Sequence, residues 1–194
     1  GFTLLDETLT RIAELKQAAI TPEALAANLQ NSKNFLDQAA PFVQEIGAER
    51  ISAKTLHLFD QLLLDLQNLP EADLKQDLTT TLALAISEAH AGSKPNTKPL
   101  TAWKNDYTKK DHNKKTIFAD QDKIDKLLSL QKVYKTYQEK LYQKGLFDFA
   151  DMLLDTLNAA EQNPELRYNL QEKYQYLLVD EFQDTSGVQL KLLD

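Results

Sequence analysis

The stretch Leu177–Ser186 reads LLVDEFQDTS, an apolar run that ends abruptly in acidic and polar residues. Aromatic and aliphatic side chains dominate residues 174–179, and they predict a short buried strand of the kind found in parallel sheets. Open α/β sheets bind their ligands at the carboxyl ends of such strands. The stretch therefore predicts a ligand site directly after residue 179.

Two adjacent carboxylates, Asp180 and Glu181, occupy that position. This is the layout of a Walker B site, in which the first acid supports a Mg²⁺ on nucleotide phosphates and the second polarises an attacking water. The alternative is that the two acids have no functional role and form a solvated turn after a strand. A metal bound here without nucleotide is not expected, because Mg²⁺ usually takes further ligands from phosphates.

Composition narrows the class of protein. The 194-residue chain has five glycines and no cysteine, which favours helices over a barrel or sandwich and excludes disulfides and thiolate metal sites. No apolar run approaches the about 20 residues of a membrane span and no signal peptide is visible, so we expect no membrane partner and a cytoplasmic location. Because Gly1 comes first and Met152 is the single methionine, we also expect a piece excised from a longer protein.

Helical periodicity covers most of the chain before the acids. Thr21-Pro22 predicts a helix start, and Pro41 predicts a kink or split in that helix. Ser52 is expected to cap a helix whose leucine stripe, residues 56–69, forms core rather than an oligomerisation zipper.

The periodicity is lost over residues 93–116, which predict an exposed loop with at most one short helix. A long helix is then expected from residue 120 to 144, ended by Gly145. Asp148 and Asp151 resemble a catalytic carboxylate pair, but we expect Asp148 to cap the next helix instead. The sequence therefore predicts a mainly α chain.

Residues 178–185, LVDEFQDT, resemble motif II of the UvrD/Rep/PcrA-like superfamily 1 DNA helicases. Residues 145–154, GLFDFADMLL, resemble the segment that precedes motif II in that family. The likeness includes residues 134–138 and the helix that follows motif II. Residues 1–7 resemble the stretch where the helical insertion of the family begins. Elsewhere the chain is similar in the order and helical character of its segments.

The resemblance implies a 3′-to-5′ translocase on single-stranded DNA, with ATP–Mg²⁺ bound between two RecA-like domains. Residues 3–144 would be the helical insertion of the first RecA-like domain. Residues 145–194 would be a short strand and helix from a truncated RecA-like segment. In this family likeness, Asp180 would hold Mg²⁺ through water and Glu181 would be the catalytic base. Gln183 and Asp184 would join the hydrogen bonds around the nucleotide.

A basic island interrupts the acidic chain. Residues 93–116 carry seven lysines and two acids, a net charge of +5 that leaves −12 for the rest of this −7 chain. One interpretation is contact with the DNA backbone near a duplex junction, with an aromatic ring on a base or sugar. The other is a solvated, mobile loop with Trp103 packed on the helices. The candidate DNA-contacting residues are Lys104, Lys109, Lys110, Lys114, Lys115, Trp103 and Tyr107.

The chain departs from a complete motor because it has no G-x-x-x-x-G-K-[ST] phosphate loop. We therefore expect ATP and Mg²⁺ as cofactors of the intact parent and no cofactor in this segment alone. Two alternatives stay open. One is the motor of a helicase–nuclease subunit of the AddA/RecB kind, which shares motif II. The other is a non-catalytic helical module for protein interaction.

Overall fold

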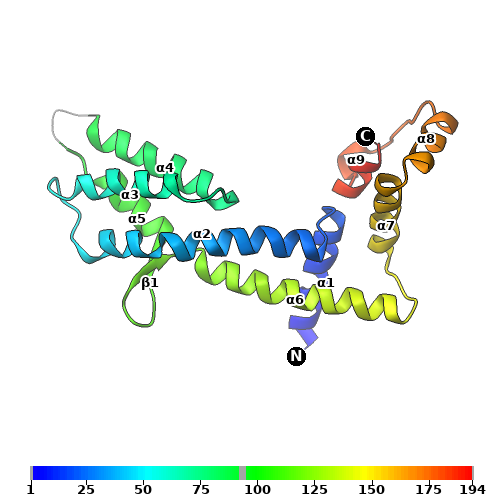
Figure 1. Cartoon of the computed structure of the whole chain (residues 1–194), viewed down its shortest axis with the longest axis horizontal. Helices are drawn as coiled ribbons and strands as arrows, with labels where there is room; N and C mark the ends of the chain where they lie inside the picture. Colours follow the sequence, from blue (N-terminus) through cyan, green and yellow to red (C-terminus); the bar gives the residue numbers. More distant parts are fainter. Residues whose placement is uncertain (1, 92–94, 194) are drawn as a thin grey trace. The chain divides into compact units, whose positions relative to one another are not determined.

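The computed structural model describes residues 2–91 and 95–193, and these are mainly α-helical, as the sequence predicts. The elements follow one another as α1 (Phe2–Gln17), α2 (Pro22–Ala48), α3 (Leu56–Asn68), α4 (Asp73–His90), α5 (Lys98–Tyr107), β1 (Thr108–Lys110), β2 (Thr116–Phe118), α6 (Gln121–Gln143), α7 (Phe149–Gln162), α8 (Pro164–Lys173), the 3₁₀ turn η1 (Phe182–Asp184) and α9 (Gly187–Leu193) (Figure 1). None of the described helices is long and apolar enough to cross a membrane.

The chain divides into two compact units. One comprises residues 26–129, and the other comprises residues 1–25 together with 130–194. The sequence predicts a different division, at residue 144, between a helical insertion and a RecA-like segment of a larger protein. This division stays a prediction.

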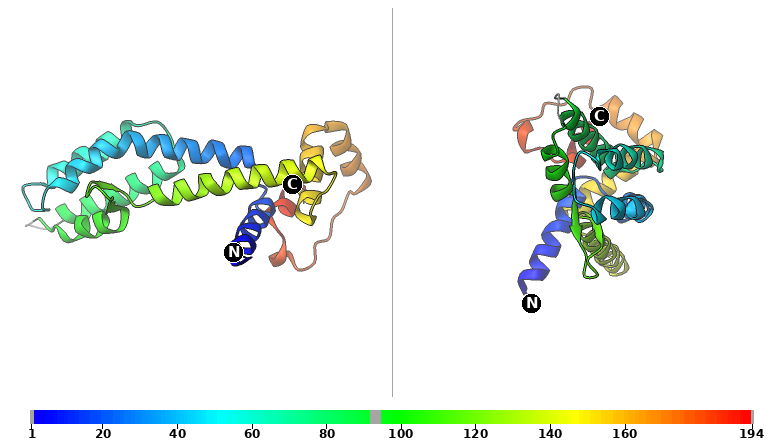
Figure 2. Two further views of the ribbon diagram at one scale, coloured as in Figure 1. Left: turned by 90° about the horizontal axis from the view of Figure 1, so that it is seen from below. Right: turned by 90° about the vertical axis from the view of Figure 1, so that its left-hand side faces the viewer.

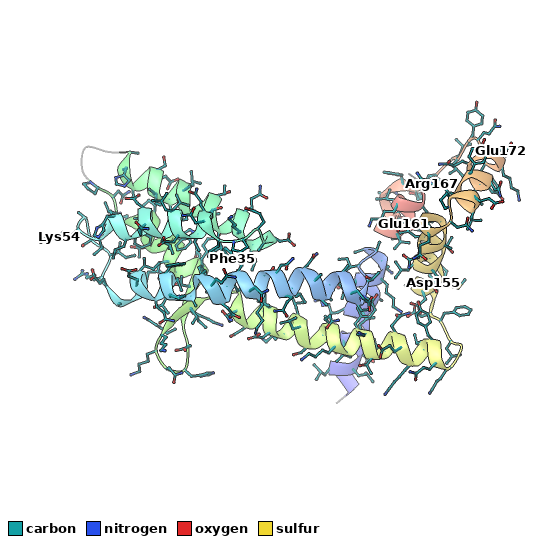
Figure 3. The ribbon with its side chains drawn as sticks, viewed as in Figure 1. Phe35, Lys54, Asp155, Glu161, Arg167 and Glu172 are labelled. Carbon is teal, nitrogen blue, oxygen red and sulfur yellow. The ribbon has the colours of Figure 1, made fainter. Side chains whose placement is uncertain are left out.

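The unit of residues 26–129 is built around an apolar core. Helix α3 buries Leu56, Phe59, Leu62 and Leu66, so the prediction that its leucine stripe forms core is confirmed. Phe35 of α2 joins the same core and is 1% exposed (Figure 3). Burying side chains of this size contributes about 1.5–3 kcal/mol each, so the stripe is enough to fix α3 in place.

The starts of α2 and α3 confirm one prediction and correct another. The Ala24 N–H donates to the Thr21 hydroxyl at 3.2 Å, which confirms the start of α2. The helix then runs through Pro41 without the predicted split. Thr55, rather than Ser52, is the residue that precedes α3. Its hydroxyl accepts from the Ser52 N–H at 2.9 Å, so the two residues form a local turn before the helix begins.

The described part of the basic island contains the one short helix that the prediction allowed, but the rest is a hairpin rather than the predicted loop. It contains α5 and an antiparallel hairpin of β1 and β2 (Figure 2). In this hairpin Thr108 lies opposite Phe118, and Lys110 lies opposite Thr116. Asp111 closes the turn, because its carboxylate accepts from two backbone N–H groups at 2.8 and 2.7 Å. Gly92, Ser93 and Lys94, where the island begins, lie outside the described residues.

The second unit contains α1, the end of α6, and α7 to α9. Gly145 ends α6 as predicted, with φ +65° and hydrogen bonds from Gly145 and Leu146 back to the last turn of the helix. Asp148 caps α7, which is also confirmed. Leu154 and Leu157 of α7 are buried with a valine of α9, so these two helices share a small core.

Residues 174–179 do not form the predicted strand. They are irregular and exposed, and Leu178 is fully so. In the described ranges the two strands, β1 and β2, pair with each other. A strand needs a neighbour for its backbone groups, so the apolar run alone does not produce one. The preceding helix α8, which carries Arg167 and Glu172, has no buried residue either (Figure 3).

Candidate functional site

The predicted site residues lie in an irregular segment between α8 and α9, here called the acid turn (residues 180–185). The Asp180 carboxylate accepts from the Glu181 N–H at 2.9 Å, and the Gln183 side-chain amide donates to the Glu181 carboxylate. The Asp184 N–H donates to the Glu181 carbonyl at 2.8 Å. Glu181 has φ +50° and ψ +46°, a left-handed conformation of a kind often found at functional sites. The structure thus brings the four predicted residues into one turn.

An open depression borders the acid turn. Asp180 and Asp184 line it from the turn, and Gln189 lines it from α9. Glu181 and Gln183 belong to the same turn but do not contribute to this lining. All four predicted residues are exposed to solvent. The two aspartates therefore border one shared, open depression.

The acid turn has no positive counter-charge in the part of the chain that the structure describes. No salt bridge there involves Asp180, Glu181 or Asp184. The described residues also contain no group of three histidine or acidic side chains placed to hold a metal. Because Mg²⁺ takes about six oxygen ligands, two aspartates would hold it only with water and phosphate oxygens. The turn suits a water-mediated contact with a metal–nucleotide complex.

Three of the five candidate lysines in the basic island are held by the protein itself. Lys104 Nζ donates to a backbone carbonyl near the end of α2 at 2.8 Å, and burial together with the nearby charge of Lys110 lowers its pKa. Lys110 Nζ donates to a threonine hydroxyl of β2 at 2.7 Å. Lys109 pairs with Asp122, and this hydrogen bond lowers the pKa of the carboxyl. The ammonium groups of these three lysines therefore make contacts that stabilise the fold.

The other two lysines lie at the hairpin tip, defined here as residues 111–115. Lys114 and Lys115 are exposed, and Lys114 has φ +61°. The ammonium group of neither lysine makes a hydrogen bond or salt bridge in the described structure, whereas the Lys115 backbone N–H donates to the Asp111 carboxylate at 2.7 Å. The hairpin tip therefore presents two solvated positive charges that a phosphate backbone could meet.

The two aromatic candidates, Trp103 and Tyr107, pack against each other, unlike the exposed lysines of the hairpin tip. Trp103 is 3% exposed, and its indole N–H donates to the Thr81 hydroxyl at 3.1 Å. Its ring stacks on Tyr107 with centroids 5.3 Å apart and an interplanar angle of 26°. Trp103 is therefore packed on the helices, as the second interpretation of the island expects. A ring buried in this way is not available to stack on a base.

The sequence prediction missed a buried ion cluster in the unit of residues 1–25 and 130–194. Lys16 is fully buried, and its ammonium lies 2.7 Å from Asp148 Oδ2 and 2.6 Å from Asp151 Oδ1. These three residues, with Tyr137 beneath the ammonium, are here called the Lys16 cluster. One signal was available in the sequence, because Lys16 follows the buried Ile12 by one helical turn and so shares its inward face.

The part of the chain that carries the acid turn and the hairpin tip matches a known family. Residues 70–194 match the family model of the UvrD/REP helicase N-terminal domain. The chain belongs to this family. The matched range contains the hairpin, α7 and the acid turn, so the resemblance to UvrD-like superfamily 1 helicases is confirmed.

Curated relatives carry helicase names. The exonuclease/helicase subunit RexA of Lactococcus lactis subsp. cremoris is 31% identical over 162 residues, which cover 69% of this chain and 13% of RexA. The ATP-dependent DNA helicase PcrA of Staphylococcus epidermidis is 43% identical over 61 residues, which cover 31% of this chain and 8% of PcrA. DNA helicase II of Haemophilus influenzae is 40% identical over 60 residues, with the same coverage of 31% and 8%. The chain thus spans only a small part of these relatives, and no solved structure matches it.

Proposed function

We propose that the chain supplies the motif II acids of an ATP-driven DNA helicase that moves 3′ to 5′ on single-stranded DNA. Asp180 supports Mg²⁺ on the nucleotide phosphates through water, and Glu181 activates the water that attacks the terminal phosphate. Gln183 and Asp184 take part in the polar network around the nucleotide. The observation that supports this best is an exposed, uncompensated acid turn inside the range that matches the helicase family.

The proposal requires a phosphate loop that this chain does not contain. The test is to determine the residues that precede Gly1 in the full-length protein. A strand followed by G-x-x-x-x-G-K-[ST] there would support the proposal. A full-length protein without such a loop would contradict it, because the acid turn would then have no triphosphate to act on.

The isolated 194-residue chain is expected neither to bind nor to hydrolyse ATP measurably. The acid turn offers carboxylates but no phosphate-binding loop, and phosphoryl transfer depends on positioning and charge neutralisation of the phosphates. Isothermal titration with ATP–Mg²⁺ and a phosphate-release assay are the measurements. A magnesium-dependent ATPase signal that disappears in Glu181→Gln would overturn this prediction.

A second candidate is the motor of a helicase–nuclease subunit of the AddA/RecB kind. The alignment with RexA covers 69% of this chain, whereas the alignment with PcrA covers 31%. The longer alignment favours this candidate over a simple helicase, because it extends beyond a segment of about 60 residues. A nuclease domain elsewhere in the full-length protein would decide for the helicase–nuclease candidate, and its absence would decide for the helicase.

We further propose that the hairpin tip contacts the phosphate backbone of DNA in the intact helicase. Replacing Lys114 and Lys115 with alanine is expected to weaken DNA binding by the chain, because two phosphate contacts are lost. The slope of log affinity against log salt is expected to fall by about 1 for each lysine. Fluorescence anisotropy with a fork-shaped DNA, recorded at several salt concentrations, measures both effects.

The matched control removes the same charge from another exposed part of the same unit. Lys54 and Lys126 are exposed (Lys54 is labelled in Figure 3), and their double alanine variant should bind DNA as the unmodified chain does. Equal losses in the two double variants would mean that only net charge matters. That result would leave the hairpin tip without a specific role.

A further inference from the structure

A fully buried lysine closes the last turn of α1. Lys16 Nζ makes ion pairs of 2.7 and 2.6 Å with Asp148 and Asp151, and it lies 5.0 Å from the ring centroid of Tyr137. Burying an ammonium is costly unless hydrogen-bonded carboxylates compensate it. A residue needed only to fill this space would be apolar. The charge of Lys16 therefore acts on its partners.

Those partners build the start of α7. Asp148 Oδ1 accepts from the Asp151 N–H and Asp151 Oδ2 accepts from the Asp148 N–H, each at 2.9 Å. Each carboxylate thus uses one oxygen for the helix backbone and the other for Lys16. Partial burial alone would raise the pKa of the Asp148 carboxyl, but hydrogen bonds from Lys16 and the Asp151 N–H outweigh it and lower that pKa. Lys16 thereby favours the ionised form of the capping carboxylate and helps to orient it.

The end of α1 also lies in close contact with the start of α9. A Cβ added to Gly187 would lie 3.2 Å from the Gln17 carbonyl oxygen and 3.4 Å from Ala18 Cα, so α9 approaches the α1 backbone more closely than most side chains allow. Val188 is 1% exposed and packs with the buried leucines of α7 and with Ala19. The residues that follow Lys16 therefore touch the helix that follows the acid turn.

Helix α9 in turn fixes the downstream end of the acid turn. The Ser186 N–H donates to the Gln189 side-chain oxygen at 2.8 Å, and the Gln189 N–H donates to the Ser186 hydroxyl at 3.3 Å. This reciprocal pair is a capping box. Because Ser186 directly follows Thr185, any shift of α9 moves the acid turn with it.

We propose that Lys16 is a positioning residue for the acid turn, acting through the end of α1 on both α7 and α9. Its ion pairs hold α1 against the α7 cap, and the close contact at Gly187 transmits that placement to α9. The role of this linkage in catalysis rests on the proposed function. The structural linkage between α1, α7 and α9 does not. It can be tested in the present chain without ATP.

The test compares Lys16→Met with Arg11→Met by amide hydrogen exchange. Arg11 lies on the same helix and forms an exposed pair with Glu14, so its loss should have little effect. In Lys16→Met we expect exchange at Asp151 in α7 and at Leu190 in α9 to accelerate about tenfold or more, because both depend on the α1 contact. Amides of α4, in the other unit, serve as the internal reference. Faster exchange in α7 with unchanged exchange in α9 would overturn the proposal.

A second variant perturbs the same linkage from α9 instead of α1. It tests the proposal even if Lys16→Met does not fold. Gly187→Ala places a methyl group 3.2 Å from the Gln17 carbonyl oxygen and should displace the end of α1 by a few tenths of an ångström. We expect the NMR signals of the Asp151 N–H and of the Gln138 side-chain amide, which donates to Asp151, to shift in this variant. A role of Lys16 in stability alone would leave them unchanged. Shifts confined to α9 and its neighbours would contradict the proposal.

Discussion

Asp151→Ala is expected to lower the free energy of unfolding by about 3–5 kcal/mol, the usual cost of removing one partner from a buried ion pair. Asp151 is fully buried. Its carboxylate pairs with Lys16 at 2.6 Å, accepts from the Gln138 side chain at 2.7 Å and accepts from the Asp148 N–H at 2.9 Å. Alanine leaves a buried ammonium with one carboxylate in place of two and removes half of the α7 cap. Urea denaturation followed by circular dichroism measures the loss.

Asp155→Ala is the matched control for this change. Asp155 lies one turn further along α7, is exposed and accepts a hydrogen bond from the Tyr142 hydroxyl at 3.0 Å (Figure 3). Its replacement should cost no more than about 1 kcal/mol, because water replaces the lost hydrogen bond. Fluorescence of Trp103, the single tryptophan, reports in the same samples on the unit of residues 26–129. Equal losses for Asp151→Ala and Asp155→Ala would show that the Lys16 cluster adds no stability.

The contrast between Asp148 and Lys16 shows what the sequence can predict. The cap of α7 depends on residues three positions apart, so its residue pattern is visible in the sequence. The partner of that cap, Lys16, lies 132 residues away from Asp148, and nothing in the local sequence connects them. Its place one helical turn after Ile12 puts Lys16 on an apolar face, but the end of such a lysine is usually solvated. Its ion-pair partners could therefore be identified only after the helices had been placed.

The sequence prediction missed the hairpin and wrongly placed a strand at residues 174–179. Both errors have the same cause. Residues 174–179 have the composition of a strand, but no strand of the described chain pairs with them. Thr108–Lys110 and Thr116–Phe118 are too short and too polar to show a pattern, yet they pair with each other across the turn at Asp111. Sheet structure depends on a neighbour, and composition does not report whether a neighbour is present.

The acid turn was found from its sequence because adjacent acids after an apolar run are visible without any long-range contact. The sequence did not predict the left-handed conformation of Glu181 or the depression that Asp180 and Asp184 share. Both depend on how η1 turns the chain toward α9. The choice of these candidate residues thus came from the sequence alone, and it stays a prediction. Their geometry required the structure.

In the full-length protein that carries this chain, Glu181→Gln is expected to lower the rate of ATP hydrolysis by about 10²–10⁴-fold, the range for loss of a positioned general base. The amide has nearly the same shape but cannot take a proton from the attacking water. ATP binding should be retained, because the proposed contact with Mg²⁺ belongs to Asp180. DNA-stimulated phosphate release and equilibrium binding of a fluorescent ATP analogue separate the two quantities.

Glu172→Gln provides the control, since it makes the same substitution at an exposed position of α8 outside the acid turn (Figure 3). Its hydrolysis rate should equal that of the unmodified protein. If Asp180→Asn and Glu181→Gln together left hydrolysis and translocation at full rate, the acid turn could not be the magnesium and water site of the motor. Loss of ATP binding along with hydrolysis in Glu181→Gln would instead assign Glu181 to the nucleotide contact rather than to the proton transfer.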